Sequence, residues 1–143
     1  MATKVDVLCV EDNEDFLRFL SHSFNKLEQP VRYDLKRSGQ EALQALNGGQ
    51  GSAGIPRMIL LDLNLPGLSG FDVLKEIRAN SRWRHIPVVV LTSSSDPRDI
   101  ELAHMMGANA YLSKPSTLAE LRSLLESTCR FWLEHHVDRD KWN

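Results

Sequence analysis

The stretch MILLDLNLPGLSG, residues 58–70, opens with four consecutive apolar residues and places Asp62 directly behind them. A short apolar run followed closely by asparagine, proline and glycine is typical of a buried strand that ends in a turn. A carboxylate at the end of a buried strand loses hydration, which costs free energy unless a cation or hydrogen bonds compensate for it. The position of Asp62 therefore predicts a positively charged partner nearby and raises the question of its function.

Apolar runs rich in Val, Ile and Leu alternate with segments of helical periodicity along the chain. The predicted strands are residues 5–10, 33–36, 58–61, 87–91 and 110–113. The predicted helices are residues 14–27, 40–46, 71–80, 98–106 and 118 onward. Each strand and helix unit takes about 29 residues, close to the ~30 of a βαβ unit. The pattern predicts an α/β fold, (βα)5, with a doubly wound parallel five-stranded sheet and helices on both faces.

Residues that begin or end helices agree with this division. Asn13 and Asp96 precede the first and fourth helical segments as N-caps, and Gly107 follows the fourth segment as a stop signal. Thr117 and Glu120 have the spacing of a capping box before the fifth helix.

The composition is that of one soluble globular domain of 143 residues, with 42% hydrophobic and 25% charged residues. We predict a single domain over residues 1–143, with a core at about 4–128 and an extended fifth helix and tail at 129–143. The formal net charge is -2 and the basic residues are scattered, which disfavours direct binding of nucleic acid. Without a membrane-spanning run or a signal peptide, the sequence predicts a cytoplasmic protein. Cys9 and Cys129 lack metal-ligand spacing and are predicted to be reduced core residues.

Four of the five predicted strands end in a residue that can take part in chemistry. Glu11 and Asp12 follow the first strand, Asp62 the third, Thr92 the fourth and Lys114 the fifth. Ligands of such sheets bind outside the carboxyl ends of the strands, where the strand order reverses. The order 2-1-3-4-5, known from other doubly wound sheets, would place the acids of the first and third strands side by side.

Three neighbouring carboxylates repel one another unless a pKa rises or a cation binds between them. Oxygen ligands alone favour a hard cation such as Mg²⁺. With such a cation, Asp62 could act as a nucleophile toward phosphorus, while Lys114 and the Thr92 hydroxyl stabilise the phosphoryl oxygens. The sequence therefore predicts that Asp62 is phosphorylated.

Four motifs occur in this order: VEDN at residues 10–13, LLDLNLPGLSG at 60–70, VVVLTSSSD at 88–96 and YLSKP at 111–115. Together they resemble the receiver domain of two-component response regulators, which has a flavodoxin-like fold. The resemblance implies Asp62 as the phosphoacceptor. It also implies a Mg²⁺ site formed by Asp12, Asp62 and the main-chain carbonyl of Asn64, with Glu11 acting largely through water. Many receivers have two aspartates where this chain has Glu11 and Asp12, which bears on metal affinity.

The same resemblance assigns the remaining site residues. Thr92 and Tyr111 would be the coupled switch residues, with Tyr111 turning from exposed to buried, and Lys114 would bind the phosphoryl group. A cis peptide bond is implied before Pro115. The protein would take its phosphoryl group from a histidine kinase and catalyse its own phosphorylation and dephosphorylation, without being an enzyme for another substrate.

Two further features resemble the receivers that partner bacterial phytochrome histidine kinases. They are the sequence FWLEHHV at residues 131–137 and the loop NGGQGSAGIPR at residues 47–57. Because the tail is too short for an output domain, we predict a stand-alone receiver. Apolar Leu124, Phe131 and Trp132 on the fifth helix predict a symmetric homodimer through helix four, strand five and helix five. The alternative is that Phe131 and Trp132 pack against their own domain.

Three alternative functions remain open from the sequence. A haloacid-dehalogenase-like phosphohydrolase would need a second aspartate two residues after the nucleophile, where this chain has Asn64. A flavodoxin-like FMN-binding protein would need a phosphate loop where this chain has the acidic EDNED, residues 11–15. A module that binds partners without phosphorylation is disfavoured by Asp62 and Lys114.

Overall fold

A computed structural model of the chain describes residues 4–48 and 55–136. Its five strands form one parallel sheet in the order β2-β1-β3-β4-β5, which confirms the predicted fold class and strand order. The strands are β1 (Val7–Val10), β2 (Tyr33–Lys36), β3 (Met58–Leu61), β4 (Val88–Thr92) and β5 (Ala110–Ser113).

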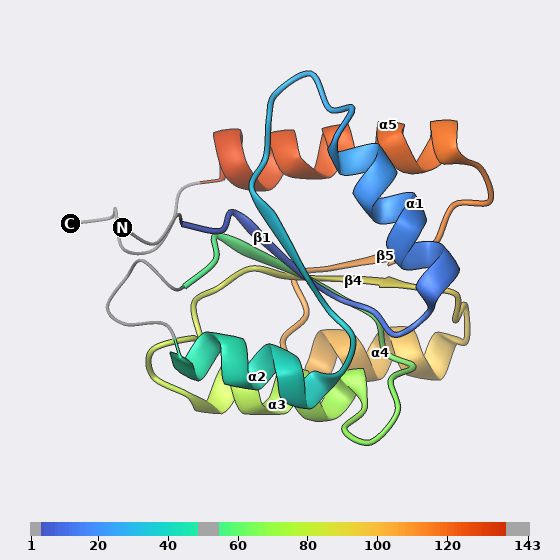
Figure 1. Cartoon of the computed structure of the whole chain (residues 1–143). Helices are drawn as coiled ribbons and strands as arrows, with labels where there is room; N and C mark the ends of the chain where they lie inside the picture. Colours follow the sequence, from blue (N-terminus) through green and yellow to red (C-terminus); the bar gives the residue numbers. More distant parts are fainter. Residues whose placement is uncertain (1–3, 49–54, 137–143) are drawn as a thin grey trace.

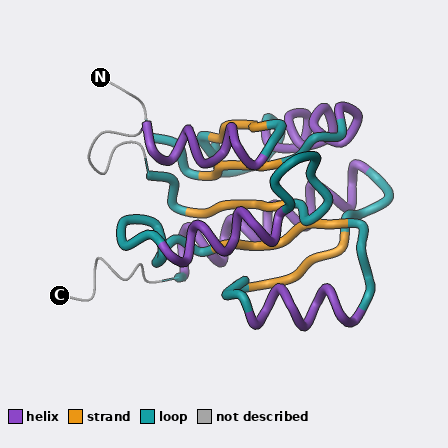
Figure 2. The backbone as a smooth tube through the Cα atoms, turned by 90° about the horizontal axis from the view of Figure 1, so that it is seen from below, coloured by secondary structure: helices purple, strands orange, loops and turns teal. Residues whose placement is uncertain are grey.

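Five α-helices cover the two faces of the sheet. They are α1 (Glu14–Phe24), α2 (Gly39–Gly48), α3 (Gly70–Ala79), α4 (Pro97–Met105) and α5 (Leu118–Cys129), and α5 continues into the π-helix η2 (Arg130–His135). In Figure 1, α1 and α5 lie on one face of the sheet, and α2, α3 and α4 lie on the other. Figure 2 shows the strands lying side by side when the molecule is seen from below.

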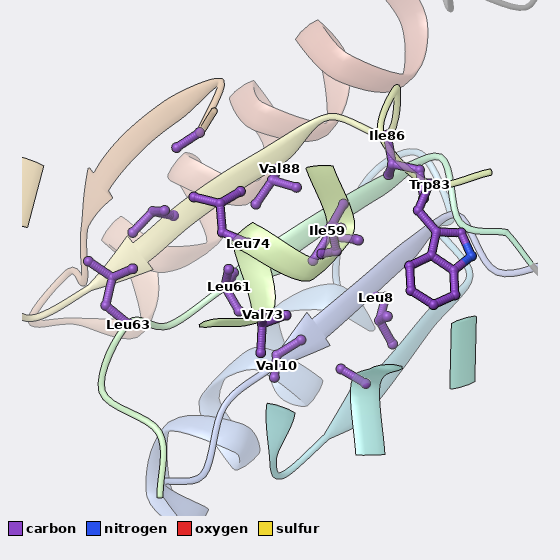
Figure 3. Close-up of a cluster of buried hydrophobic side chains, with 14 of the residues drawn as sticks. Leu8, Val10, Ile59, Leu61, Leu63, Val73, Leu74, Trp83, Ile86 and Val88 are labelled. Carbon is purple, nitrogen blue, oxygen red and sulfur yellow. The ribbon is translucent and has the colours of Figure 1, made fainter. Parts of the chain in front are cut away.

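The apolar side chains form one cluster on each face of the sheet. Alternate residues of a strand point to opposite faces. On β3, Ile59 and Leu61 therefore join the cluster under α3 that Figure 3 shows, whereas Met58 and Leu60 join the cluster under α1 and α5. Because both faces are covered, β1, β3 and β4 are buried along their whole length, as the uninterrupted apolar runs predicted.

The predicted helix caps are confirmed by hydrogen bonds. The side chains of Asn13, Asp96 and Thr117 each accept a hydrogen bond from a backbone amide two or three residues ahead. Gly107 follows α4 with φ of 104°, a left-handed conformation that glycine adopts without strain. A complete capping box, formed by Ser69 and Asp72 at the start of α3, was not predicted, whereas the box predicted for Thr117 and Glu120 is described only in its Thr117 half.

The C-terminal helix differs from the prediction. The expected apolar face assumed one α-helix from Leu118 to Trp132, but α5 ends at Cys129, and η2 follows with a backbone hydrogen bond from His136 to Phe131. A π-turn holds one more residue than an α-turn, so the side-chain pattern rotates after Cys129. Leu118, the first residue of the helix, is 39% exposed.

Arg78, on α3, joins three segments at the amino edge of β4 and β5. Its guanidinium donates hydrogen bonds to the backbone carbonyls of Arg84, Ile86 and Gly107 and to the side chain of Asn109, at 2.8 to 3.0 Å. Asn109 Oδ1 also accepts a hydrogen bond from the first amide of β4, at 2.8 Å. We name this arrangement the Arg78 clamp, and it fastens α3, the start of β4 and the end of α4 to one another.

Cys9 and Cys129 are buried free thiols in the cluster under α1 and α5, as predicted. Burial raises the pKa of Cys129 to about 12, so the thiol stays protonated and unreactive at neutral pH. No helix within residues 4–48 and 55–136 is both long and apolar enough to cross a membrane.

Candidate functional site

The register of the sheet brings two of the predicted acids together. Val10 pairs with Leu61 at the ends of β1 and β3, so the residues that follow, Glu11 and Asp62, lie beside each other. The Asp62 amide donates to the Val10 carbonyl at 3.1 Å, which continues the ladder by one residue. Glu11 and Asp62 are 2% and 4% exposed, so both carboxylates lie at the edge of the apolar core.

Asp12 completes an acidic cluster at the same edge. One carboxylate oxygen from each of Glu11, Asp12 and Asp62 lies within 4.8 Å of the other two. Asp12 is exposed, whereas its two neighbours are buried, so the cluster opens to solvent on the side of Asp12. The structure thus brings together the three side chains that the sequence predicted for a metal site.

Lys114 lies between the two buried acids. Its Nζ is 2.6 Å from Glu11 Oε1 and 3.1 Å from Asp62 Oδ2. The closer contact to Glu11 was not predicted. Glutamate is longer than aspartate by one methylene, and this length lets Glu11 bind the lysine while its other oxygen accepts the amide of Asn13 at 2.9 Å.

Burial and charge act against each other at this site. Desolvation raises the pKa of Glu11, and this effect outweighs the hydrogen bonds from Lys114 and Asn13, which lower it. Desolvation alone would lower the pKa of Lys114, but the hydrogen bond to Glu11 and the charge of Asp62 together raise it. Lys114 therefore stays protonated, and its charge compensates the buried acids.

Phe16 forms the apolar side of the lysine pocket. Lys114 Nζ lies over its ring, 4.6 Å from the centroid. The space between the ring and the carboxylates is nearly filled, because the cavity left there has a volume of about 10 Å³. The apolar spacing within the first predicted helix, residues 14–27, puts Phe16 on its apolar face but does not indicate the contact with Lys114. A signal was available, since side chains in the first turn of a helix point back toward the residues that precede it.

Thr92 is the last residue of β4 and is fully buried. Its Oγ1 lies 3.5 Å from the amide of Ser94, and the Ser94 carbonyl accepts a hydrogen bond from Tyr111 Oη at 2.9 Å. Ser94 Oγ donates to Asp99 on α4 at 2.6 Å, a contact that was not predicted. Thr92 and Tyr111, the predicted switch residues, are thus joined through the loop between β4 and α4. Tyr111 is half-buried and packs against the core cluster under α3.

Gly70 allows the loop after β3 to close against the site. A Cβ atom at Gly70 would lie 2.3 Å from the Asp62 carbonyl oxygen and 2.6 Å from the Leu63 Cα. Backbone atoms therefore occupy the space that any other residue would need. From the sequence, Gly70 was predicted only to be part of a turn.

Asn64 lies beside the acids, but the described contacts do not identify its main-chain carbonyl as a metal ligand. The Asn64 amide donates to Asp62 Oδ1 at 3.3 Å, and its side chain is exposed. The expected cis bond before Pro115 is wrong for this structure, in which every described peptide bond is trans. The trans isomer is the more stable form of an X–Pro bond by ~0.5–1 kcal/mol.

The residues predicted for dimerisation lie away from this site. In Figure 1 the end of α5 lies at the opposite edge of the sheet from the carboxyl ends of the strands. Leu124 and Trp132 pack in part against the core of their own domain. For Trp132 this agrees with the alternative to dimerisation, in which Phe131 and Trp132 pack against their own domain. Phe131 is 52% exposed and lies edge-on against Trp132, with ring centroids 4.9 Å apart.

Comparison with known proteins assigns the family. The sequence profile of the response regulator receiver domain matches residues 7–126. This chain belongs to that family. The probable methanogenesis regulatory protein FilR2 of Methanothrix harundinacea is 38% identical over 128 residues, which cover 89% of this chain and 83% of FilR2. Response regulator Rcp1 of Synechocystis sp. is 34% identical over 130 residues, covering 90% of this chain and 88% of Rcp1.

Solved receiver structures resemble the whole arrangement. The phosphorylated cyanobacterial phytochrome response regulator RcpA matches with a TM-score of 0.84 and 31% identity, covering 96% of this receiver and 99% of RcpA. The Mn²⁺-bound form of Rcp1 matches with a TM-score of 0.80 and 33% identity, covering 94% of this receiver and 98% of that chain. Because the chain belongs to the receiver family, the phosphohydrolase and the flavin-binding protein are rejected as alternative functions.

The acidic cluster has the chemistry of a site for a divalent cation. Three carboxylates against the single charge of Lys114 leave an excess of negative charge, and oxygen is the ligand that hard divalent cations prefer. The residues present in this receiver thus fit a divalent metal.

Proposed function

We propose that this receiver accepts a phosphoryl group on Asp62 from the phosphohistidine of a partner kinase, with Mg²⁺ bound at the acidic cluster. The observation that carries the proposal is the pairing of the buried Asp62 carboxylate with Lys114 at 3.1 Å, beside two further carboxylates. A nucleophile, a cation for the phosphoryl oxygens and a metal-ligand set lie together at one edge of the sheet.

Asp62 supplies the nucleophile of the transfer. A carboxylate oxygen of Asp62 attacks the phosphorus, the bond between phosphorus and the histidine nitrogen breaks, and the imidazole leaves with the bonding electrons. Asp12, Asp62 and the main-chain carbonyl of Asn64, with Glu11 acting largely through water, would hold Mg²⁺, which would neutralise negative charge on the phosphoryl group. Lys114 moves its hydrogen bonds from the carboxylates to the phosphoryl oxygens. The same site would admit the water that later hydrolyses the acyl phosphate.

We propose that the Thr92 hydroxyl reports the modification. When the Thr92 hydroxyl donates to a phosphoryl oxygen, Thr92 would pull the loop after β4 toward the site. The Ser94 carbonyl of this loop accepts the hydrogen bond from the Tyr111 hydroxyl. Movement of this loop changes the position of Tyr111 and of the surface formed by α4, β5 and α5. This connection supports Thr92 and Tyr111 as the switch residues.

The signalling context follows from the relatives. RcpA is a phytochrome response regulator, and its near-complete overlap with this chain supports a phytochrome-type histidine kinase as the partner in the cytoplasm. The extension that motivated this prediction is described as far as His136, whereas residues 49–54 of the loop and 137–143 of the tail lie outside the described residues.

Measurement of phosphoryl transfer tests the proposal. Acetyl phosphate and Mg²⁺ are expected to add one phosphoryl group to the wild type, read by intact mass spectrometry, and chelation of Mg²⁺ should prevent it. Lys114→Ala is expected to slow the reaction by about tenfold to a hundredfold, because a positive charge is lost from the phosphoryl oxygens. Lys75→Ala, which removes an exposed lysine of α3, should react as the wild type does.

Two outcomes would contradict these expectations. A wild type that gains no phosphoryl group would favour the remaining alternative, a module that binds partners without phosphorylation. Equal rates for Lys114→Ala and Lys75→Ala would reject the role of Lys114 while leaving Asp62 as the acceptor.

A homodimer through α4, β5 and α5 is the proposed output of the switch. Phe131 on η2 and Leu102 and Met105 on α4 are 52%, 42% and 75% exposed, and exposed apolar side chains of this size favour association. Leu124 and Trp132 would contribute to the interface with only part of their surface, because both already pack in part on the core of their own domain. Phosphorylation would shift the equilibrium toward the dimer by the difference in stability that it creates.

Phe131→Glu is expected to weaken this dimer at least about tenfold, since burying one phenylalanine side chain contributes ~1.5–3 kcal/mol. Sedimentation of the wild type and the variant, each with and without beryllofluoride and Mg²⁺, measures the effect. Phe19→Glu is the matched control, because Phe19 is 43% exposed on α1, outside the proposed interface. A wild type that stays monomeric, or a dimer equally sensitive to both variants, would disprove this interface.

A further inference from the structure

Besides the two carboxylates, Lys114 contacts an uncharged group, the ring of Phe16. The ammonium lies 4.6 Å from the ring centroid, within the ~6 Å over which a cation is attracted to an aromatic face. The Lys114 side chain is only 14% exposed and Phe16 is 9% exposed, so little water screens the contact. Cation–π attraction is strongest where the cation has lost its hydration.

The ring is held in place by the fold and not by the lysine. Asn13 caps α1 by accepting the Phe16 amide at 2.9 Å, which fixes the backbone of Phe16 in the first turn. Its side chain belongs to the core cluster under α1 and α5, together with Leu20 of α1 and Leu91 of β4. A ring packed in this way presents the same face to Lys114 whatever binds at the acidic cluster.

The two anionic partners of Lys114, Glu11 and Asp62, cannot keep the same contact with the lysine throughout the reaction. Phosphorylation changes Asp62 into an acyl phosphate, and a cation at the cluster would compete with the lysine for the oxygens of Glu11. The lysine must therefore exchange its hydrogen-bond partners during the reaction. An uncharged attractive surface keeps the ammonium near the site during this exchange without neutralising its charge.

We propose that Phe16 is a positioning residue for phosphoryl transfer, which holds the Lys114 ammonium over the site through the face of its ring. This inference rests on the proposed function for its effect on the reaction. The position of the lysine over the ring can be tested without any reaction. An aliphatic side chain would fill the same space in the core but would not attract the cation.

The first test measures the contact itself in the protein without metal. A ring current shifts the NMR signals of protons above its face, so the Lys114 ε-methylene protons are expected upfield in the wild type. Phe16→Leu should abolish this shift, and Phe16→Tyr, which keeps an aromatic face, should retain it. Unshifted lysine protons in the wild type would overturn the proposal, whether or not the protein accepts phosphate.

The second test measures the rate of phosphorylation by acetyl phosphate at saturating Mg²⁺. Phe16→Leu is expected to lower the rate about threefold to tenfold, the range that a partly desolvated cation–π contact supports, and Phe16→Tyr should restore it. Phe24→Leu is the matched control, because Phe24 lies in the same cluster and on the same helix but stacks on Tyr33, with centroids 4.6 Å apart. If Phe16→Leu and Phe24→Leu lower the rate of phosphorylation equally, Phe16 acts only through packing and the proposal is wrong.

Two further measurements separate electronic from steric effects. Replacing Phe16 with phenylalanines of increasing ring fluorination weakens cation binding at nearly constant shape, so the rate should fall stepwise with each fluorine. In a Lys114→Met background, Phe16→Leu should cause no further loss, because the cation is already absent. A rate indifferent to fluorination, or an undiminished loss in the Lys114→Met background, would overturn the proposal even if Phe16→Leu fails to fold.

Discussion

Asp62→Asn is expected to accept no phosphoryl group from acetyl phosphate, a loss of at least about a hundredfold relative to the wild type. Asparagine has nearly the shape of aspartate, but its amide oxygen is a poor nucleophile. The substitution also removes one of the buried charges that Lys114 compensates, so the fold should be retained. Intact mass spectrometry after incubation with acetyl phosphate and Mg²⁺ measures the loss, and circular dichroism checks the fold.

Asp15→Asn is the control for this experiment. Asp15 is an exposed carboxylate on α1 that pairs with Arg18 at 3.1 Å, with both side chains mostly in solvent. The control should be phosphorylated like the wild type. A phosphoryl group found on Asp62→Asn would show that another residue is the acceptor and would remove the basis of the proposed function.

Gly70→Ala is expected to destabilise the protein by about 3 kcal/mol or more, because overpacking against rigid atoms usually costs ~1–3 kcal/mol and here both neighbours are backbone. The added Cβ would lie 2.3 Å from the Asp62 carbonyl oxygen, so β3 and α3 must separate at the phosphorylation site. Urea unfolding measures the loss of stability. The same displacement should slow phosphorylation of the fraction that still folds.

Gly48→Ala provides the comparison within this chain. A Cβ at Gly48, the last residue of α2, meets no described atom within 4 Å. Since alanine favours a helix over glycine by up to ~1 kcal/mol, this variant should be as stable as the wild type or slightly more stable. Similar unfolding curves for Gly70→Ala and Gly48→Ala would show that the loop after β3 adapts to the extra methyl group.

The strands and the residues at their ends could be predicted because both depend on features that a sequence carries directly, whereas the strand order was taken from other doubly wound sheets. Buried parallel strands appear as uninterrupted apolar runs, and the residue after each run lies at the carboxyl edge of the sheet. Asp62, Thr92 and Lys114 were identified in this way. Their position needs only the strand ends and a parallel sheet, and is insensitive to side-chain conformation.

The contacts inside the site could not be predicted to the same degree. The preference of Lys114 for Glu11 over Asp62 depends on side-chain lengths and on differences of a few tenths of an ångström. The approach of Phe16 to the lysine depends on packing between β5 and α1, which are distant in sequence. Both contacts follow from tertiary structure, whereas sequence periodicity describes one element at a time.

The C-terminal helix shows a second limit of sequence patterns. An α-helical period places Leu118 and Trp132 on one face, but the period changes at Cys129, where η2 begins. The guanidinium of Arg57 donates to the Leu133 carbonyl, and such contacts from outside the helix can favour the wider turn. A side chain from another segment leaves no trace in the spacing of apolar residues.

The Arg78 clamp fixes the C-terminal end of α4, so that the helix would move mainly at its N-terminal end. Gly107, just past the end of the helix, is hydrogen-bonded to Arg78 of α3, whereas the start at Pro97 is joined to the carboxyl end of β4 by the loop that contains Ser94. A helix of 9 residues is ~13 Å long, so moving its free end by ~1 Å turns it by only about 4°. Phosphorylation would therefore reach a partner as a small rotation of the exposed side of α4, with its largest displacement near Pro97 and almost none at the fastened end.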